Sequence, residues 1–233
     1  MDEAYKDKVL SVVVPCYNEE QSILDLVKAV VAAPVLHKEI IIVDDCSRDN
    51  TPQILRESVE PLVSKVIYCS ENRGKGAAVR RGIAEATGDV IIIQDADLEY
   101  SPQEYPRIIE PVLAGQAEAC YGSRFMHKHL VNGAYLANVL ANIFLTWLSN
   151  LFTGYRLTDM ETCFKAVRRD VMQSLVLEQE RFGIEPEITA KLAKKGCKIV
   201  EVPIEYNPRT KSDGKKIGFK DGLQAIRCIL KYR

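Results

Sequence analysis

The sequence lacks the clustered cysteines and histidines that organise metal sites and disulfide frameworks. Its seven cysteines are spread along the chain with no C-x-x-C pair, and it has only three histidines. Structural zinc sites need closely spaced ligands, and disulfide-rich domains need a dense, even set of cysteines. Neither feature is therefore expected, and a reducing cytosol is the predicted environment.

Two nucleotide-binding fingerprints are also missing. The chain contains no G-x-x-x-x-G-K-[ST], and no G-x-G-x-x-G follows its first predicted strand. Both motifs use glycine backbone amides to cradle phosphates, so their absence disfavours a P-loop ATPase and a dinucleotide-dependent oxidoreductase. A nucleotidyltransferase is disfavoured as well, because its glycine-rich first loop is not present.

Charge of one sign is not in excess, since the net charge is -1. That balance excludes a globally basic nucleic-acid binder. The opening MDEAYKDK has no apolar stretch of the kind found in a signal peptide, which again predicts a cytoplasmic protein. The halves differ, however: residues 1–120 carry 12 basic and 21 acidic side chains, and residues 121–233 carry 19 and 11. The second half is the one suited to phosphates or anionic lipid.

What the chain does contain is a regular alternation of strand and helix patterns. Its 233 residues are 47% hydrophobic, enough for one large core, so we predict a single domain over 1–233. Short apolar runs predict strands at 9–15, 39–43, 65–69, 89–94, 161–167 and 198–204, and helical patterns occur at 20–33, 52–60, 75–86, 187–195 and 218–230. The alternation predicts an α/β fold, a doubly wound and mostly parallel sheet, over 8–125.

Polar loops follow the predicted strands. They start at Pro15, Asp44, Asn72 and Asp95, and the ligands of such sheets bind at the carboxyl ends of the strands, so these loops should converge on one site. Acids in the first two loops can accept hydrogen bonds from a base or ribose, or can simply cap helices. The third loop, NRGKG, places amides and cations at a helix start, where an anion is favoured.

The fourth loop holds a pair of carboxylates. Asp95 and Asp97 follow an apolar strand and flank Ala96, so their side chains lie on the same side of an extended segment. Two hard oxygen ligands there suit Mg²⁺ or Mn²⁺ shared with a diphosphate. Glu99 is placed to add a ligand or to contact a sugar. A solvated acidic turn is the simpler alternative for D-x-D alone.

Residues 129–155 contain no Asp, Glu, Lys or Arg. Polar residues recur there every four positions, at Asn138, Asn142, Thr146 and Asn150. The opposite helical face is apolar and comprises Leu140, Ile143, Phe144, Trp147, Leu148, Leu151 and Phe152. This pattern predicts an amphipathic helix, either packed on the domain or lying in a membrane interface with Lys128 and Arg156 near its ends.

Eight motifs, in order along nearly the whole chain, carry a resemblance to a known family. They are VVPCYNEE (13–20), VDDCSRDNT (43–51), NRGKG (72–76), DADLEYSP (95–102), GSRF (122–125), LTDMETCFKAVRR (157–169), RFGIEPEI (181–188) and PRTKSDGKKIG (208–218). The chain resembles family 2 glycosyltransferases of the GT-A fold, within them the polyprenyl-phosphate branch of dolichyl-phosphate mannose or glucose synthase-like enzymes. It departs from the mannosyl-synthase pattern at Glu99 and at 161–165, which leaves the sugar open.

The resemblance implies an inverting, metal-dependent transfer of a sugar from GDP-mannose or UDP-glucose to a polyprenyl phosphate at the cytosolic membrane surface. Residues 8–125 would bind the nucleotide sugar, and 126–233 would serve the acceptor and the membrane. The implied donor-binding residues are Pro15, Tyr17, Glu19, Val43, Asp45, Lys75, Asp95, Ala96, Asp97, Glu99, Arg209 and Lys216. Asp95 and Asp97 would hold Mg²⁺ or Mn²⁺. The implied catalytic residues are Asp97, Arg124 and Asp159, and Arg124 with Lys128 would meet the acceptor phosphate.

Some alternatives stay open at this stage. Asp159 would orient the nucleophile or accept a proton, or would merely cap a helix. A saccharide hydroxyl is the competing acceptor. A nucleotide-sugar-binding adaptor without catalytic turnover is disfavoured, because both carboxylates expected to hold the metal are present. Peripheral membrane contact through 129–155 is expected, no nucleic-acid partner is expected, and a second copy or a separate membrane subunit is left open.

Overall fold

The computed structural model describes residues 5–35, 37–126, 136–208 and 219–233. Within them, seven strands form one sheet in the order β3-β2-β1-β4-β6-β5-β7. The strands are β1 (Val9–Cys16), β2 (His37–Asp44), β3 (Lys65–Tyr68), β4 (Val90–Ile93), β5 (Ala119–Ser123), β6 (Lys165–Arg168) and β7 (Ile199–Pro203). Strands β1 to β4 pair in parallel and β5 pairs in parallel with β7, whereas β6 is antiparallel to β4 and β5. The predicted mostly parallel α/β sheet is confirmed.

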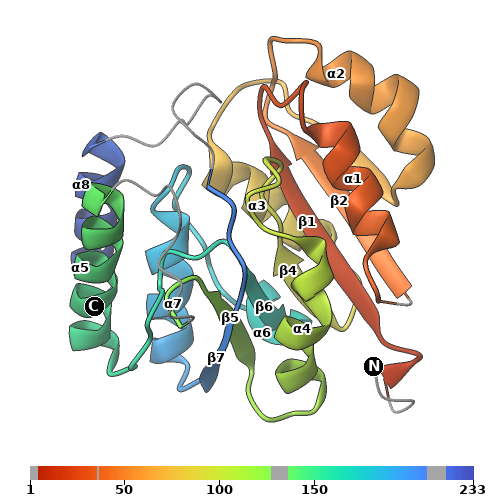
Figure 1. Cartoon of the computed structure of the whole chain (residues 1–233). Helices are drawn as coiled ribbons and strands as arrows, with labels where there is room; N and C mark the ends of the chain where they lie inside the picture. Colours follow the sequence, from red (N-terminus) through yellow and green to blue (C-terminus); the bar gives the residue numbers. More distant parts are fainter. Residues whose placement is uncertain (1–4, 36, 127–135, 209–218) are drawn as a thin grey trace.

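Helices cover both faces of this sheet. They are α1 (Ile23–Ala32), α2 (Thr51–Ile54), α3 (Lys75–Glu85), α4 (Tyr105–Leu113), α5 (Leu136–Thr153), α6 (Arg169–Gln173), α7 (Ile184–Lys194) and α8 (Phe219–Lys231). Figure 1 shows α1 and α4 in front of the sheet and α3 behind it, with α5 and α8 beside α7 at one end. Strands from both halves of the chain therefore share one sheet.

The central strand β1 explains why the sheet is buried on both faces. Val12, Val13 and Val14 are fully buried, and consecutive buried residues on a strand require cover on both sides. Burial of each such side chain stabilises the fold by about 1.5–3 kcal/mol. On α3, Gly82 packs so closely on Val13 that an added Cβ would lie 2.3 Å from Val13 Cγ1. The core thus brings α3 and β1 together and fixes the loop that precedes α3.

Two predicted elements differ from the structure. The strand expected at 161–167 begins only at Lys165, because the Cys163 amide donates to the Tyr100 hydroxyl (3.3 Å) instead of to a neighbouring strand. The helix expected at 52–60 is one α-helical turn followed by a wider π turn, Leu55–Val59, and a 3₁₀ turn. Thr51 lies in the first turn of this helix, and its hydroxyl accepts the Glu19 amide.

Helix α5, predicted to be amphipathic, turns Leu145 and part of its polar stripe toward the protein, whereas Asn138 is exposed. Thr146 is 3% exposed and Ser149 is buried, whereas the exposed apolar side chains are Leu140, Ile143, Phe144, Trp147, Leu151 and Phe152. Trp147 is 58% exposed and Leu151 63%. Leu148, expected on the same apolar face, packs against the core instead. The helix itself is packed on the domain through Leu145, Thr146 and Ser149, while these six apolar side chains are exposed in the described part of the chain. Packing on the domain is therefore observed, and contact with a membrane interface stays a prediction.

Candidate active site at the carboxyl edge of the sheet

The first two loops are joined by side chains that cross between them. Asn18 adopts a left-handed backbone (φ 52°), its amide donates to Ser47 Oγ (2.9 Å), and its Oδ1 accepts from the Arg48 amide (2.8 Å). Asn18 and Ser47 therefore connect loops rather than cap helices. Pro15 and Val43 lie side by side in the register of β1 and β2, below these loops.

Two further predicted nucleoside residues, Tyr17 and Glu19, follow β1 in the first loop. Both are partly buried, and Glu19 Oε2 accepts from the Ser22 hydroxyl at 2.8 Å. Both residues lie on the loop that follows β1, and hydrogen bonds join this loop to residues 44–51, which follow β2. The structure thus places both predicted nucleoside loops together at one sheet edge.

The amides directly before α3, a helix start expected to favour an anion, are bound by a carboxylate of the protein. Asp45 is 3% exposed, and its two oxygens accept the amides of Arg73 (3.0 Å) and Gly74 (2.6 Å). Gly74 has φ 99°, which only glycine adopts readily. Asp45 therefore binds the two amides directly before α3, and an anion at the amides of the helix itself stays a prediction.

Lys75, the first residue of α3, lies in a buried charge cluster. Its Nζ is 2.8 Å from Asp95 Oδ1 and 3.1 Å from Glu185 Oε1, and Lys165 Nζ is 2.8 Å from Glu185 Oε2. Burial alone would lower the pKa of Lys75, but Asp95 and Glu185 raise it well above its usual value. Lys75 therefore stays charged and orients Asp95. Glu185 was not selected from the sequence, although a glutamate within an apolar helical pattern could have indicated a buried charge.

The loop after β4 carries Asp95, Asp97 and Glu99, the carboxylates predicted to bind a metal and the donor. Asp97 Oδ1 accepts the Glu99 amide (3.2 Å) across Leu98, whose backbone is left-handed (φ 60°), and Ala96 is buried. In the described part of the chain, no three Asp, Glu, His or Cys side chains are grouped so that they could hold a metal. The donor set nevertheless fits Mg²⁺ or Mn²⁺, since these ions are commonly held by one or two carboxylates together with substrate phosphates and water.

Arg124 and Asp159 form a buried bidentate pair. Arg124 Nε and Nη2 each lie 2.7 Å from an oxygen of Asp159, and the Arg124 amide also donates to Asp159 (3.0 Å). The Arg124 side chain is 9% exposed and that of Asp159 is 0% exposed. This pairing engages one edge of the guanidinium, and Nη1 lies outside it. Asp159 is not a helix cap, and both its oxygens are directed at Arg124.

Glu201 on β7 fixes the backbone around Asp159. Its carboxylate accepts the amides of Thr158 (2.7 Å) and Asp159 (3.0 Å). Burial raises the pKa of Glu201, and these hydrogen bonds oppose the shift. The segment that carries Asp159 is therefore held to the sheet.

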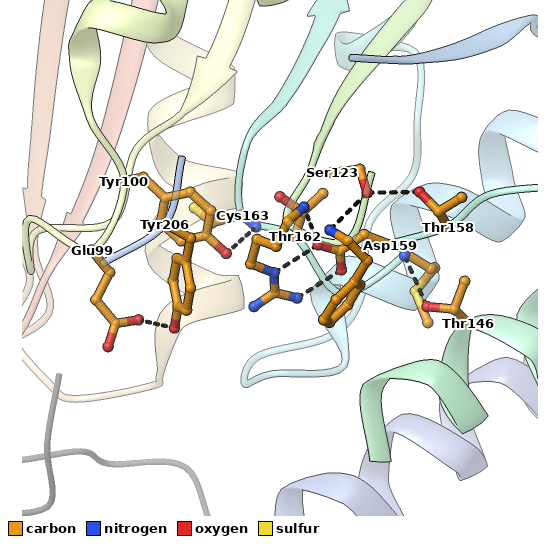
Figure 2. Close-up of polar contacts among 12 residues, drawn as sticks. Glu99, Tyr100, Ser123, Thr146, Thr158, Asp159, Thr162, Cys163 and Tyr206 are labelled. Carbon is orange, nitrogen blue, oxygen red and sulfur yellow. Dashed lines mark hydrogen bonds and ion pairs between the residues drawn. The ribbon is translucent and has the colours of Figure 1, made fainter. Parts of the chain in front are cut away.

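Tyr206 lies between the loop after β4 and Arg124. Its hydroxyl donates to Glu99 Oε2 (2.6 Å), and the Arg124 guanidinium carbon is 5.3 Å from its ring centroid (Figure 2). The centroids of the Tyr206 and Tyr100 rings are 5.2 Å apart. Sequence analysis missed Tyr206, and its position directly before the basic segment 208–218 was the signal available.

Glu161 is a second residue that the motifs did not single out. Burial raises the pKa of its carboxyl to about 7, while Lys165 opposes the shift and Glu185 adds to it. Its buried Oε1 has no hydrogen-bond partner among the described residues. Glu161 is therefore a group whose ionisation is costly near neutral pH.

Three predicted site residues, Lys128, Arg209 and Lys216, lie outside the described residues, as do positions 129–135 of the amphipathic segment. None of the helices in the described ranges is both long and apolar enough to cross a membrane.

Comparison with known proteins agrees with the sheet and its loops. The family described as Glycosyl transferase family 2 matches residues 11–176. The chain is 31% identical over 231 residues to an uncharacterized protein of Methanocaldococcus jannaschii, covering 94% of this chain and 91% of that one. It is 31% identical to the dolichol-phosphate mannosyltransferase of Pyrococcus furiosus (90% of this chain, 59% of that one). It is 32% identical to an undecaprenyl-phosphate 4-deoxy-4-formamido-L-arabinose transferase of Pseudomonas fluorescens (91% and 61%).

The chain thus spans about three fifths of the length of the two relatives whose names give an activity. Among solved structures, glucosyl-3-phosphoglycerate synthase of Mycobacterium tuberculosis, in complex with Mn²⁺, UDP and glucosyl-3-phosphoglycerate, matches with a TM-score of 0.74. The match has 19% identity and covers 98% of this chain and 81% of that one, which shows a shared fold. On the family match and these identities, the chain belongs to glycosyl transferase family 2.

Proposed function

We propose that this protein transfers a hexose from a nucleoside diphosphate sugar to a polyprenyl phosphate at a membrane surface, with inversion. The observation that carries the lipid acceptor is the exposed apolar face of α5, which the protein turns away from its own core. The names of the Pyrococcus and Pseudomonas relatives, both transferases acting with prenyl phosphates, support the same acceptor class.

The proposed donor site is the carboxyl edge of β1, β2 and β4. The nucleoside would lie along Pro15, Tyr17, Glu19, Val43 and Asp45, and the diphosphate near Asp95, Ala96, Asp97, Glu99 and Lys75. Asp95 and Asp97 would hold Mg²⁺ or Mn²⁺, which when bound neutralises charge on the leaving diphosphate. Arg209 and Lys216, assigned by the family motif, would add two cations on the same side.

The proposed acceptor site is centred on Arg124. Its Nη1 edge would donate to the lipid phosphate, helped by Lys128, while Asp159 keeps the guanidinium oriented. A phosphate oxygen would attack the anomeric carbon as the bond to the diphosphate breaks, and the nucleoside diphosphate leaves with the electron pair. Because a phosphate monoester is already ionised near neutral pH, no strong base is needed. Asp159 would thus act through Arg124 instead of accepting a proton.

The proposed membrane contact is reversible and peripheral, at the cytosolic face. Helix α8 packs on α5 and exposes Leu223 and Leu230, which flank the exposed Arg227 on one face of that helix. Apolar side chains beside a cation suit an anionic bilayer surface, where each Lys or Arg contributes about 1 kcal/mol. A second copy or a separate membrane subunit is compatible with this surface.

A panel of GDP-mannose and UDP-glucose against undecaprenyl and dolichyl phosphate in vesicles tests the proposal. We expect one donor to yield a glycosyl prenyl phosphate with inverted anomeric configuration. Transfer only to saccharide hydroxyls would support the competing acceptor class. Donor binding without transfer to any acceptor would support a non-catalytic nucleotide-sugar-binding adaptor.

A further inference from the structure

Two polar residues of α5 bond to the segment that carries Asp159. Thr146 Oγ1 accepts the amide of Met160 (3.0 Å), and the Asn150 side chain bonds both the amide (3.0 Å) and the carbonyl (2.8 Å) of Leu157. The Thr146 bond is visible at the right of Figure 2. These side chains belong to the uncharged polar stripe that the sequence placed on one side of this helix.

The same short segment determines where Arg124 lies. Asp159 stands between Leu157 and Met160, and its carboxylate accepts the Arg124 amide, Nε and Nη2. A fully buried carboxylate with two guanidinium bonds has little freedom to move independently of its backbone. A displacement of the 157–160 backbone would therefore displace the guanidinium.

We propose that Thr146 and Asn150 are positioning residues for Arg124, which set its guanidinium at a fixed height relative to the exposed apolar face of α5. This inference rests on the proposed function, in which Arg124 meets a lipid phosphate. The exposed apolar side chains and the two polar side chains project in different directions from one helix, whose diameter with side chains is ~10–12 Å. A lipid phosphate occupies a defined depth in the bilayer, so the cation that meets it must be held at a defined distance from the side chains that enter it.

The simpler alternative is that the two bonds only pack α5 onto the domain. In that case their loss would lower stability and would affect donor and acceptor use to the same extent. Positioning predicts instead a selective effect on the acceptor, since Asp95, Asp97 and Lys75 belong to other segments. The two alternatives therefore differ in the ratio of acceptor use to donor use, which can be measured.

Thr146→Val tests the inference, because it keeps the side-chain shape and removes the acceptor of the Met160 amide. We expect kcat/KM for a long-chain prenyl phosphate in vesicles to fall about tenfold, with the KM for the donor within about twofold, as estimated for a lost hydrogen bond to a buried amide. Thr146→Ser should recover activity to within about twofold. The matched control is Thr153→Val on the same helix, whose hydroxyl donates to the Ser149 carbonyl of its own turn.

A second measurement does not depend on turnover. Hydrogen exchange should become faster at the amides of 157–160 and at Arg124 Nε–H in Thr146→Val but not in Thr153→Val, with 75–97 unchanged. Unchanged exchange at Arg124 Nε–H, or equal loss of donor and acceptor use with a lowered melting temperature, would overturn the inference. If the unmodified protein transfers nothing to a prenyl phosphate, the proposed function fails, while the exchange data still decide whether Thr146 positions Arg124.

Discussion

Tyr206 donates its hydroxyl hydrogen bond to Glu99 across 2.6 Å while its ring lies against the guanidinium of Arg124. One side chain thus contacts both the proposed metal-binding loop and the proposed acceptor cation. Hydrogen bonding to Glu99 and burial raise the pKa of Tyr206, so the phenol stays protonated and remains a donor at physiological pH. Tyr206 therefore links the proposed donor and acceptor parts of the site, although it was assigned to neither part.

Tyr206→Phe should keep the ring contact with Arg124 and lose the bond to Glu99. We expect kcat/KM for the donor to fall about tenfold, because a hydrogen bond to a charged group contributes ~1.5–3 kcal/mol, and steady-state kinetics will measure this. Tyr155→Phe is the matched control, since its hydroxyl bonds the Cys197 carbonyl. Equal activity of the two variants would remove Tyr206 from the site.

Metal removal tests the carboxylates after β4. EDTA, or Asp97→Asn, should abolish transfer without changing the melting temperature, because the loop contributes ligands for the diphosphate-bound ion and little to the core. Asp170→Asn serves as the control, since Asp170 pairs with the exposed Arg168. Full turnover in EDTA would rule out the metal.

Replacing Trp147 and Phe152 together by Ser should reduce co-sedimentation with anionic vesicles and activity on a long-chain prenyl phosphate. Donor binding and melting temperature should hardly change, because both side chains are exposed. A control double variant, Leu62→Ser with Val176→Ser, removes comparable exposed apolar residues outside α5 and α8. Unaltered vesicle binding of the Trp147 and Phe152 variant would exclude α5 as the membrane contact.

Glu161 predicts a pH-dependent contribution to stability. Because its folded-state pKa is raised from 4.5 to about 7, folding favours the protonated form, and that contribution is lost as pH rises through about 7. Glu161→Gln removes the ionisation, so it should raise the melting temperature more at pH 8.5 than at pH 5. Differential scanning calorimetry at the two pH values measures this. A shift of the same size at both would show that Glu161 does not ionise in this range.

Much of the architecture followed from local pattern. The apolar runs of β1, β2 and β4 and the intervening helical periodicity predicted a parallel sheet, because only strands covered on both faces read as continuous apolar stretches. The same rule placed the loops after Pro15, Asp44 and Asp95 at one edge. The polar stripe of α5 was likewise readable from its four-residue spacing.

By itself, then, the sequence determined the fold class, the family and the edge of the sheet where the candidate site is expected, since these depend on periodicity and on motifs contiguous in the chain. Which side of α5 faces the protein was decided only in three dimensions, by the bonds of Thr146 and Asn150 to Met160 and Leu157. The pairing of Arg124 with Asp159 and the hydrogen bonds of Asp45 to the loop before α3 were decided in the same way. Each of these contacts joins residues far apart in sequence or on different elements, and the energy of a charge or a polar group depends on which partner the packed core brings within hydrogen-bond distance.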